Sequence, residues 1–227
     1  MMSKTNNFVL SIVFVLLLVI TVSGSSYAYF SATVSSNQND ISGKTDTFIV
    51  DLDISAVKSG NLIPVRDNLI ISTLNGDYIC EDTRGYSLCN LYRVRLTNRG
   101  DVQTLIGYIK TNSSTYITSN LKYQLFTLNN GTYTAASDAL VINHTANATN
   151  YFTLSSNNIN FSLTDGNTTN QISDYYLAIW ISDPNSNQLE DQDKVYNGTI
   201  NFVSSDGNDK VNASFIVNSG GGGGTET

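Results

Sequence analysis

The sequence predicts an all-β protein, a jelly-roll-like sandwich of two β-sheets, preceded by an N-terminal signal or transmembrane helix. Three observations support this fold class. About ten short segments alternate apolar and polar residues or are apolar throughout, and turn residues separate them. No segment beyond residue 30 has an extended helical period. A charge-free apolar run lies at the N-terminus and predicts export of everything behind it.

The apolar run covers Phe8–Phe30. Lys4 precedes it, its uncharged centre is roughly 15 residues long, and a small-x-small pair ending at Ala28 follows. These are the three parts of a secretory signal peptide. We therefore predict that signal peptidase cleaves between Ala28 and Tyr29. The alternative is retention of the whole run as a membrane anchor, because its full length suffices to span a bilayer.

Composition and charge restrict the expected partners. The chain has 12 Lys and Arg against 19 Asp and Glu, a net charge of −7, and its only local basic cluster is Arg93, Arg95 and Arg99. Nucleic acid and anionic lipid both require clustered basic residues, so neither is an expected partner. Membrane contact is expected only through an uncleaved leader. The 41% of hydrophobic residues predict a packed core.

Four segments are expected along the chain. Residues 1–28 form the signal peptide, 29–45 an N-terminal extended arm, 46–218 the β-sandwich domain, and 219–227 a Gly-rich flexible tail. No internal repeat is evident. We expect one sandwich domain that is secreted or displayed on the cell surface.

The first two predicted strands differ in pattern. Phe48–Ile54 alternates strictly, and Asp51 and Asp53 occupy its polar face, as expected for a half-buried strand. An extended connection that contains Pro64 follows. Asn68–Thr73 is then predicted as the second strand, and an Asn-Gly turn closes it.

The next two strands are predicted to form an antiparallel hairpin. Leu91–Thr97 alternates, with its apolar residues directed inward and Arg93 and Arg95 directed to water. Residues 98–101 turn the chain, and 103–110 returns as the partner strand.

The second half of the domain holds the remaining strands. Leu121–Phe126 is closed by an Asn-Asn-Gly turn, and short strands are expected around residues 140–142, 151–154 and 159–163. Tyr175–Ile181 is apolar on both faces, which predicts a position in the middle of a sheet. Two further strands, at 195–203 and 212–217, complete the domain.

Cys80 and Cys89 are the only cysteines. In an exported chain such a pair is interpreted first as a disulfide, here closing a hairpin that contains a Gly turn. On the chain-entropy estimate, a loop of about ten residues gives about 2–3 kcal/mol of stabilisation. The alternative is two reduced cysteines.

Residues that could carry catalysis are scarce. His144 is the only histidine, and no nucleophile, zinc or phosphate-binding motif is present in the sequence. We therefore expect no enzyme, no catalytic residue, no cofactor and no metal site. Loose binding of Ca²⁺ by the loop carboxylates Glu190, Asp191 and Asp193 is an alternative, although the loop lacks the EF-hand pattern.

Glycosylation acceptor triplets, Asn-x-Ser/Thr, are numerous but close to the number that chance gives for so Asn-rich a chain. All lie beyond residue 111, which suggests a decorated surface if the source glycosylates. The acceptor residues are Asn112, Asn130, Asn143, Asn147, Asn160, Asn167, Asn197 and Asn212.

Several short motifs together resemble one family. Ser26-Tyr-Ala-Tyr-Phe-Ser-Ala-Thr33 is similar to the signal-peptide exit of TasA- and camelysin-like secreted proteins of Bacillota, and Gly43–Leu52 resembles their first strand. Leu91–Gly100 resembles a family strand that ends in an Asn-x-Gly turn. Tyr176–Ile181 and Tyr196–Phe202 resemble the two closing strands. The motifs cover most of the chain, but each is short.

The resemblance implies a jelly-roll subunit of an extracellular fibre or biofilm matrix that polymerises with itself. An N-terminal donor strand of one subunit would complete the sheet of the next, with Tyr29, Phe30, Ala32 and Val34 as donor residues. Proteolysis, described for camelysin-like members, is not carried over, since this chain has no zinc-ligand set. The alternative is a membrane-anchored monomeric surface protein that acts as an adhesin or binding module.

Overall fold

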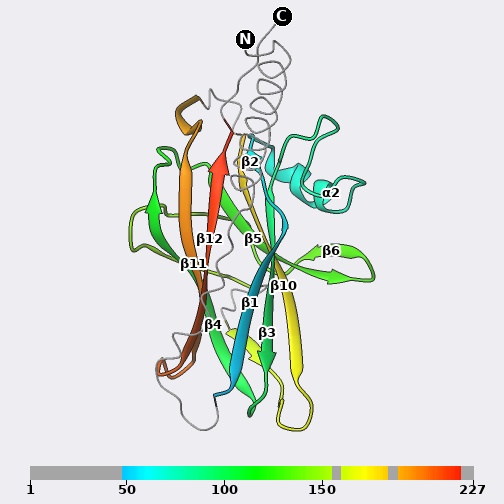
Figure 1. The fold of residues 1–227 in the computed structure, drawn as a ribbon, viewed down its shortest axis with the longest axis vertical. Helices are drawn as coiled ribbons and strands as arrows, with labels where there is room; N and C mark the ends of the chain where they lie inside the picture. Colours follow the sequence, from blue (N-terminus) through cyan, green and yellow to red (C-terminus); the bar gives the residue numbers. More distant parts are fainter. Residues whose placement is uncertain (1–47, 155–159, 184–188, 221–227) are drawn as a thin grey trace, which may run out of the picture. The chain divides into compact units, whose positions relative to one another are not determined.

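The computed structural model describes residues 48–154, 160–183 and 189–220 (Figure 1). The predicted signal peptide, the Ala28–Tyr29 cleavage site, the arm with its donor residues and most of the Gly-rich tail lie outside the described residues. In the part of the chain that is described, no helix has the length and hydropathy needed to cross a bilayer.

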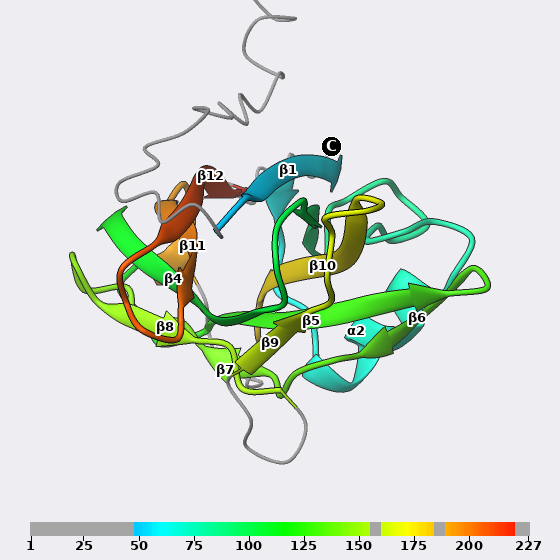
Figure 2. The same ribbon diagram turned by 90° about the horizontal axis from the view of Figure 1, so that it is seen from below.

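The described residues form two six-stranded sheets with almost no helix (Figures 1 and 2). The all-β two-sheet sandwich predicted from the sequence is therefore confirmed. Sheet A has the order β1-β3-β10-β5-β6, with β7 also pairing with β5, and sheet B has the order β2-β12-β11-β4-β8, with β9 also pairing with β4. The strands of sheet A are β1 (Val50–Lys58), β3 (Asn90–Asn98), β5 (Leu121–Asn129), β6 (Thr132–Ala135), β7 (Leu140–Val141) and β10 (Gln171–Ile181). Those of sheet B are β2 (Asn61–Leu62), β4 (Gln103–Ser114), β8 (Thr149–Tyr151), β9 (Asn160–Leu163), β11 (Val195–Ser204) and β12 (Lys210–Ser219).

The strand order differs from the jelly roll that we expected. In a jelly roll the first strand pairs with the last strand of the barrel, whereas β1 here pairs with β3 and β12 pairs with β11. The order β1-β3-β10-β5 opposite β12-β11-β4 corresponds to A-B-E-D opposite G-F-C of an immunoglobulin-type sandwich. The short strands β8 and β9, from the connection between β5 and β10, extend sheet B beyond β4.

The predicted hairpin between residues 91–97 and 103–110 is wrong. The two segments are strands β3 and β4, and they belong to different sheets. The turn between them is a crossover, which the fully buried amide of Asn98 fixes in place. Its Nδ2 donates to the carbonyl oxygens of Asp101 (2.8 Å) and Thr164 (2.7 Å), and its Oδ1 accepts from the N–H of Gly100 (3.1 Å).

Other strand predictions are confirmed. Strand β10 lies in the middle of sheet A, hydrogen-bonded to β3 on one side and to β5 on the other. Asn130 and Gly131, the predicted turn between β5 and β6, both have positive φ angles, as a two-residue hairpin turn requires. Short strands also form in the region between residues 140 and 163.

The main core lies between the sheets and consists of the inward-facing alternate residues of both. At its centre, the rings of Phe152, Phe161 and Phe202 surround Gly107 of β4. A Cβ atom at Gly107 would lie only 2.7, 2.8 and 2.9 Å from atoms of these three rings. Glycine is therefore required here by the close approach of the aromatic side chains rather than by the backbone conformation.

Replacing Gly107 by alanine should lower the free energy of unfolding by about 1–3 kcal/mol, because the three rings must move to admit the methyl group. Urea unfolding would measure the change. The matched control is the double variant Gly107→Ala/Phe152→Leu, in which a smaller side chain leaves room. Its loss should be smaller than the sum of the two single losses; additivity would contradict the steric explanation.

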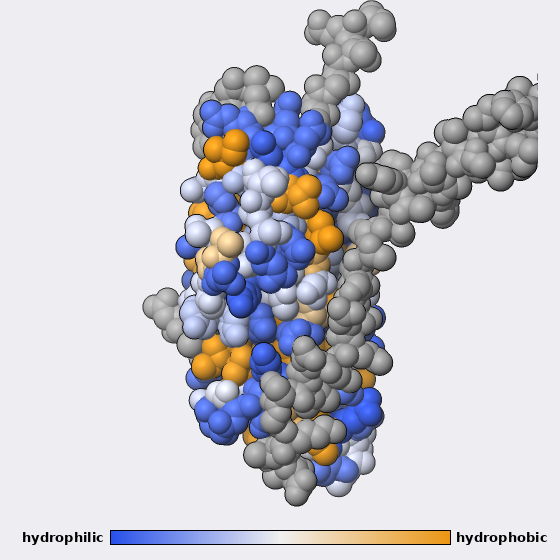
Figure 3. Space-filling view, turned by 60° about the vertical axis from the view of Figure 1, so that its left-hand side comes forward, coloured by the Kyte–Doolittle hydropathy of each residue, from blue (hydrophilic) through white to orange (hydrophobic). Residues whose placement is uncertain are grey.

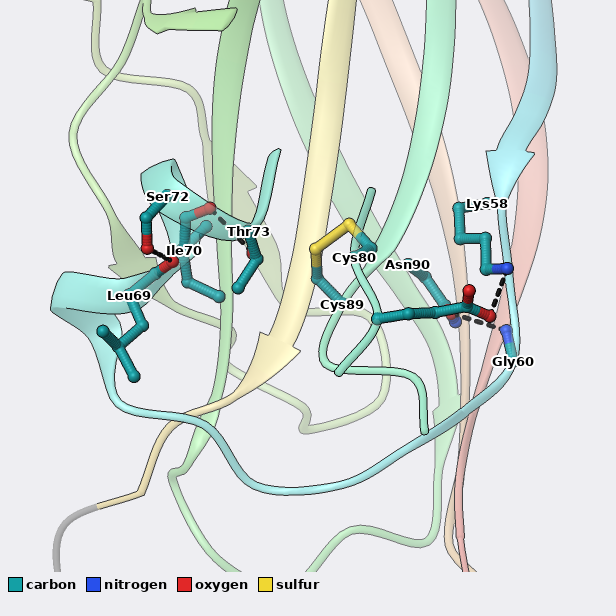
Figure 4. Close-up of a disulfide and its surroundings, with 10 residues drawn as sticks. Lys58, Gly60, Leu69, Ile70, Ser72, Thr73, Cys80, Cys89 and Asn90 are labelled. Carbon is teal, nitrogen blue, oxygen red and sulfur yellow. Dashed lines mark hydrogen bonds and ion pairs between the residues drawn. A yellow bond between two sulfur atoms is a disulfide. The ribbon is translucent and has the colours of Figure 1, made fainter. Parts of the chain in front are cut away.

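A second, smaller core covers part of the outer face of sheet A. Residues 65–89 lie over β10 there, with Trp180 as the largest buried side chain. The predicted strand Asn68–Thr73 is wrong, because this stretch forms a 3₁₀ turn (η1, Asp67–Leu69) and the short helix α2 (Ile70–Leu74). Ile70 and Leu74, four residues apart, are buried while Ile71 is exposed, which is a helical spacing. Figure 4 shows the Thr73 hydroxyl donating to the Ile70 carbonyl oxygen (2.9 Å).

Three ion pairs connect the strands on the outer face of sheet A. Their N–O distances are 2.8 Å for Arg99–Asp51, 3.6 Å for Arg93–Asp53 and 2.7 Å for Arg95–Asp174. Arg93 and Arg95 thus point outward as predicted, but they are only partly exposed. Arg95 donates two hydrogen bonds to Asp174, and these lower the pKa of the Asp174 carboxyl below 3.8.

The Arg95–Asp174 pair should make stability depend on acid pH. A carboxyl whose pKa is lowered by folding stabilises the protein above its unfolded pKa, and this contribution is lost as the pH falls through the folded pKa. Because both side chains are about one-third exposed, solvent screens the pair and we expect a small contribution. Asp174→Asn should therefore be less stable than the wild type near neutral pH and equal to it in strong acid. Urea midpoints across the acid range would check this, and a pH-independent difference would contradict it.

Candidate assembly edges

The strands at one side of the sandwich, β1 of sheet A and β12 of sheet B, are the candidate functional site. They lie beside each other, and Figure 2 shows both at the same side of the molecule. Each is hydrogen-bonded along its length on one side only, to β3 and to β11 respectively. Main-chain groups on the other side can accept a further strand.

The β1 edge consists of the outward main-chain groups of Val50, Leu52, Ile54 and Ala56. The bond from the Arg99 N–H to the Ile49 oxygen (2.8 Å) shows that odd-numbered residues of β1 exchange hydrogen bonds with the β3 side. In an antiparallel ladder these pairs alternate, so the even-numbered residues direct their N–H and C=O groups away from β3. No other described strand pairs with them. A register shift between Ala56 and Lys58 ends the regular edge.

The β12 edge is shorter. The bonds from the Ser204 N–H to the Asp209 oxygen (2.8 Å) and from the Ser219 N–H to the Lys194 oxygen (2.9 Å) assign the odd-numbered residues of β12 to the β11 side. Of the even-numbered residues, Asn218 pairs with the short strand β2. The main-chain groups of Asn212 and Ser214 have no partner strand among the described residues.

Tyr92 restricts the β12 edge further. Its hydroxyl donates to the carbonyl oxygen of Ile216 at 2.8 Å, from β3 of the opposite sheet. Burial raises the pKa of this tyrosine, which keeps the hydroxyl protonated as a donor. The alternation in Leu91–Thr97 predicts an inward position for Tyr92, but nothing local in the sequence indicates a contact across 124 positions. The β1 edge is therefore the longer of the two open edges.

The predicted disulfide is present. Cys80 and Cys89 are bonded, with a Cα–Cα distance of 4.8 Å, and both are fully buried in the second core (Figure 4). The loop that they close forms a tight turn, in which the Leu88 N–H donates to the Cys80 oxygen at 2.8 Å. It covers the outer face of sheet A and does not belong to either open edge.

The predicted glycosylation acceptors all lie outside the core. Six are exposed, and Asn197 and Asn212 are half-buried on β11 and β12. The Asn112 amide donates to Asn197 Oδ1 (3.2 Å) and Thr199 Oγ1 (2.8 Å), so two acceptors on neighbouring strands are in contact.

The acidic loop does not fit the alternative of a loose calcium site. Asp191 is 2% exposed, and its carboxylate accepts from the N–H groups of Ile117 (3.0 Å) and Thr118 (3.2 Å) and from the Thr118 hydroxyl. These donors occupy the oxygen atoms that a cation would need. Within the described ranges, no three His, Cys, Asp or Glu side chains form a group that could hold a metal ion.

Comparison with known proteins shows no family. The chain matches no protein-family model and no curated protein sequence. One similar solved structure is a FixG-related protein from Vibrio parahaemolyticus, with 6% identity and a TM-score of 0.35 over 75% of this chain and 95% of that one. Another is AvmM, which catalyses macrocyclization in alchivemycin A biosynthesis, with 10% identity and a TM-score of 0.34 over 76% and 90%. Similarities this low carry no inference about function.

Proposed function

We propose that the protein is an extracellular structural subunit that assembles with copies of itself into a fibre or biofilm matrix by N-terminal strand donation. The observation that carries the proposal is the open β1 edge, where four alternate residues direct their main-chain groups away from β3 and have no partner strand among the described residues. A buried disulfide is compatible with an extracellular location. The resemblance of the leader and strand motifs to TasA-like proteins supports the same function.

In this proposal the arm of one subunit adds to the β1 edge of the next. Main-chain hydrogen bonds would supply affinity, and alternate side chains would supply specificity. Phe30, Ala32 and Val34 share one face of an extended arm and would be directed toward the core, while Tyr29 would anchor its start. Fully extended, residues 29–45 span roughly 55 Å, against roughly 30 Å for β1, so the arm is long enough to reach and cover that strand.

Removal of one outward N–H from the β1 edge should stop assembly. Proline has no N–H and is tolerated at a sheet edge where that group is not needed for the ladder. We expect Leu52→Pro to remain a monomer in light scattering and electron microscopy under conditions in which the wild type forms filaments. Leu52→Pro could unfold the domain, because it also removes the packing of the Leu52 side chain. Ala56→Pro is then the variant to use, since the Ala56 side chain is exposed on the same edge.

The matched control is Ser214→Pro, the same change at the shorter β12 edge, which should still polymerise. Deletion of residues 29–34 should also abolish polymers and leave a folded monomer. Filaments formed by the deletion variant, or by Leu52→Pro and Ala56→Pro, would refute donation to β1. If only Ser214→Pro fails to form filaments, the strand that accepts the arm is β12 and not β1.

The alternative is a membrane-anchored monomer that acts as an adhesin or binding module. It requires that the apolar leader is retained, whereas strand donation requires a free Tyr29. N-terminal sequencing of the natural protein separates the two, since an intact leader in the membrane fraction supports the anchor.

A further inference from the structure

The outer face of sheet B has an unusual composition for this chain. It consists of the residues of β4, β8, β9, β11 and β12 that alternate with the buried core positions. Asn, Ser and Thr side chains dominate it, with single apolar residues between them. Figure 3 turns the left-hand side of Figure 1, where β11 lies, toward the viewer and shows a mainly hydrophilic surface with separate hydrophobic residues.

Strand register places two rows of side chains across this face. The first row is Asn212, Asn201, Tyr108 and Tyr151, one residue from each of four adjacent strands. Asn201 is itself buried, and its amide donates to the Thr199 carbonyl oxygen at 2.9 Å, so the other three residues form the accessible part of this row. The second row, one repeat along the strands, is Ser214, Thr199, Lys110 and Thr149. Four strands cover roughly 14 Å, so the two rows together form a shallow platform, with amides and two aromatic rings in the first row and hydroxyls and one lysine in the second.

The two tyrosines form the aromatic part of the platform. Their ring centroids are 5.6 Å apart with the planes tilted by 59°. Tyr151 is 49% exposed, although apolar ring surface of this size is usually buried, and Tyr108 is half-buried beside it. An exposed aromatic pair on a rigid sheet offers flat apolar contact area at little entropic cost.

Charge on this face is opposite to the charge of the whole chain. The net charge is −7, yet the outward positions of the sheet B strands carry Lys110 and Lys210 and no Asp or Glu. The ion pairs that the structure records all involve other residues, so neither lysine has a carboxylate partner among the described residues. Two separated cations are too few for nucleic acid, but they complement an occasional carboxylate.

We infer that the outer face of sheet B binds an acidic polysaccharide of the uronate class. Tyr108 and Tyr151 contact the apolar faces of sugar rings, the Asn and Thr side chains exchange hydrogen bonds with sugar hydroxyls, and Lys110 binds a carboxylate. The face has many neutral donors and acceptors, an aromatic platform and isolated positive charge, and a polymer of hydroxylated rings with spaced carboxylates matches all three. The inference does not depend on polymerisation, because this face is separate from the β1 edge.

The test is affinity electrophoresis of the full chain in gels that contain polygalacturonate. Two matched polymers serve as comparators: the methyl-esterified form, which keeps the sugar rings without the charge, and poly-L-glutamate, which keeps the charge without the rings. We expect retardation by polygalacturonate and clearly weaker retardation by both comparators. Tyr151→Ala should weaken binding by about tenfold, the upper range for loss of one aromatic contact.

Two variants complete the test. Tyr78→Ala, which removes a tyrosine that is 60% exposed in the loop before Cys80, should leave binding unchanged. Lys110→Gln should reduce the salt dependence of binding to polygalacturonate while leaving weak binding to the ester unaffected. The inference is overturned if polygalacturonate does not retard the protein, if poly-L-glutamate retards it equally, or if Tyr151→Ala and Tyr78→Ala behave alike.

Discussion

Replacing Trp180 by alanine should lower the free energy of unfolding by about 3–5 kcal/mol, the range for removal of a buried Trp. The side chain is fully buried in the second core, under α2 and the disulfide. Its Nε1–H donates to Asp67 Oδ1 at 2.8 Å, and Asp67 also pairs with Lys122. Partial burial of Asp67 opposes ionisation, but the hydrogen bonds from Lys122 and Trp180 outweigh it and lower the pKa of the carboxyl.

Urea unfolding followed by far-ultraviolet circular dichroism would measure this loss, since Trp180 is the only tryptophan and its fluorescence disappears with it. The matched control is Trp180→Phe, which keeps most of the packing and removes the hydrogen bond. It should cost about 1–3 kcal/mol, because the Asp67 acceptor is charged. A loss below about 1 kcal/mol for the alanine variant would show that the second core adds little to the stability of the sandwich.

Removing the disulfide should lower the free energy of unfolding by about 2–3 kcal/mol. Cys80→Ala/Cys89→Ala is the suitable variant, because serine would place hydroxyls at two positions that are fully buried. The loop that the bond closes is short, with a sequence separation of 9, so the constraint on the unfolded chain is moderate.

Reduction of the wild type supplies the control for the cysteine variant. Urea midpoints with and without a reducing agent should differ for the wild type and coincide for the double alanine variant. A wild type that is insensitive to complete reduction would contradict a stabilising role for the bond. Because Trp180 and the cysteines share one core, losses from combining the two changes should not add.

Residue patterns predicted which faces are buried more reliably than which strands are neighbours. The alternation in β3 predicted that strand and its buried residues, because every second side chain of a half-buried strand faces the core. The apolar run in β10, with apolar residues on both faces, predicted a strand in the middle of a sheet. The same alternation does not identify a partner. The turn after Asn98 looked like a hairpin turn, yet the Asn98 amide bonds to Thr164, 66 positions away, and fixes a crossover between sheets.

Local pattern also failed where tertiary contacts decide the structure. A run of apolar residues at 69–71 resembles a strand, but Ile70 and Leu74 are buried together in the second core, and this selects a helical turn. The candidate edges could not be predicted for a related reason. An edge is defined by the strands that do not pair with it, and the Tyr92 bond that shortens the β12 edge links opposite sheets.

The position of β1 has a mechanical consequence for any filament built by strand donation. The arm joins the domain at the start of β1, and the neighbour's arm would lie along the same strand. Tension applied to the ends of the filament would therefore enter and leave each subunit through β1, loading its ladder with β3 in shear. The load would fall on this ladder and on the inward side chains of β1 in the main core, whereas the second core, which contains no β1 residue, lies outside this path.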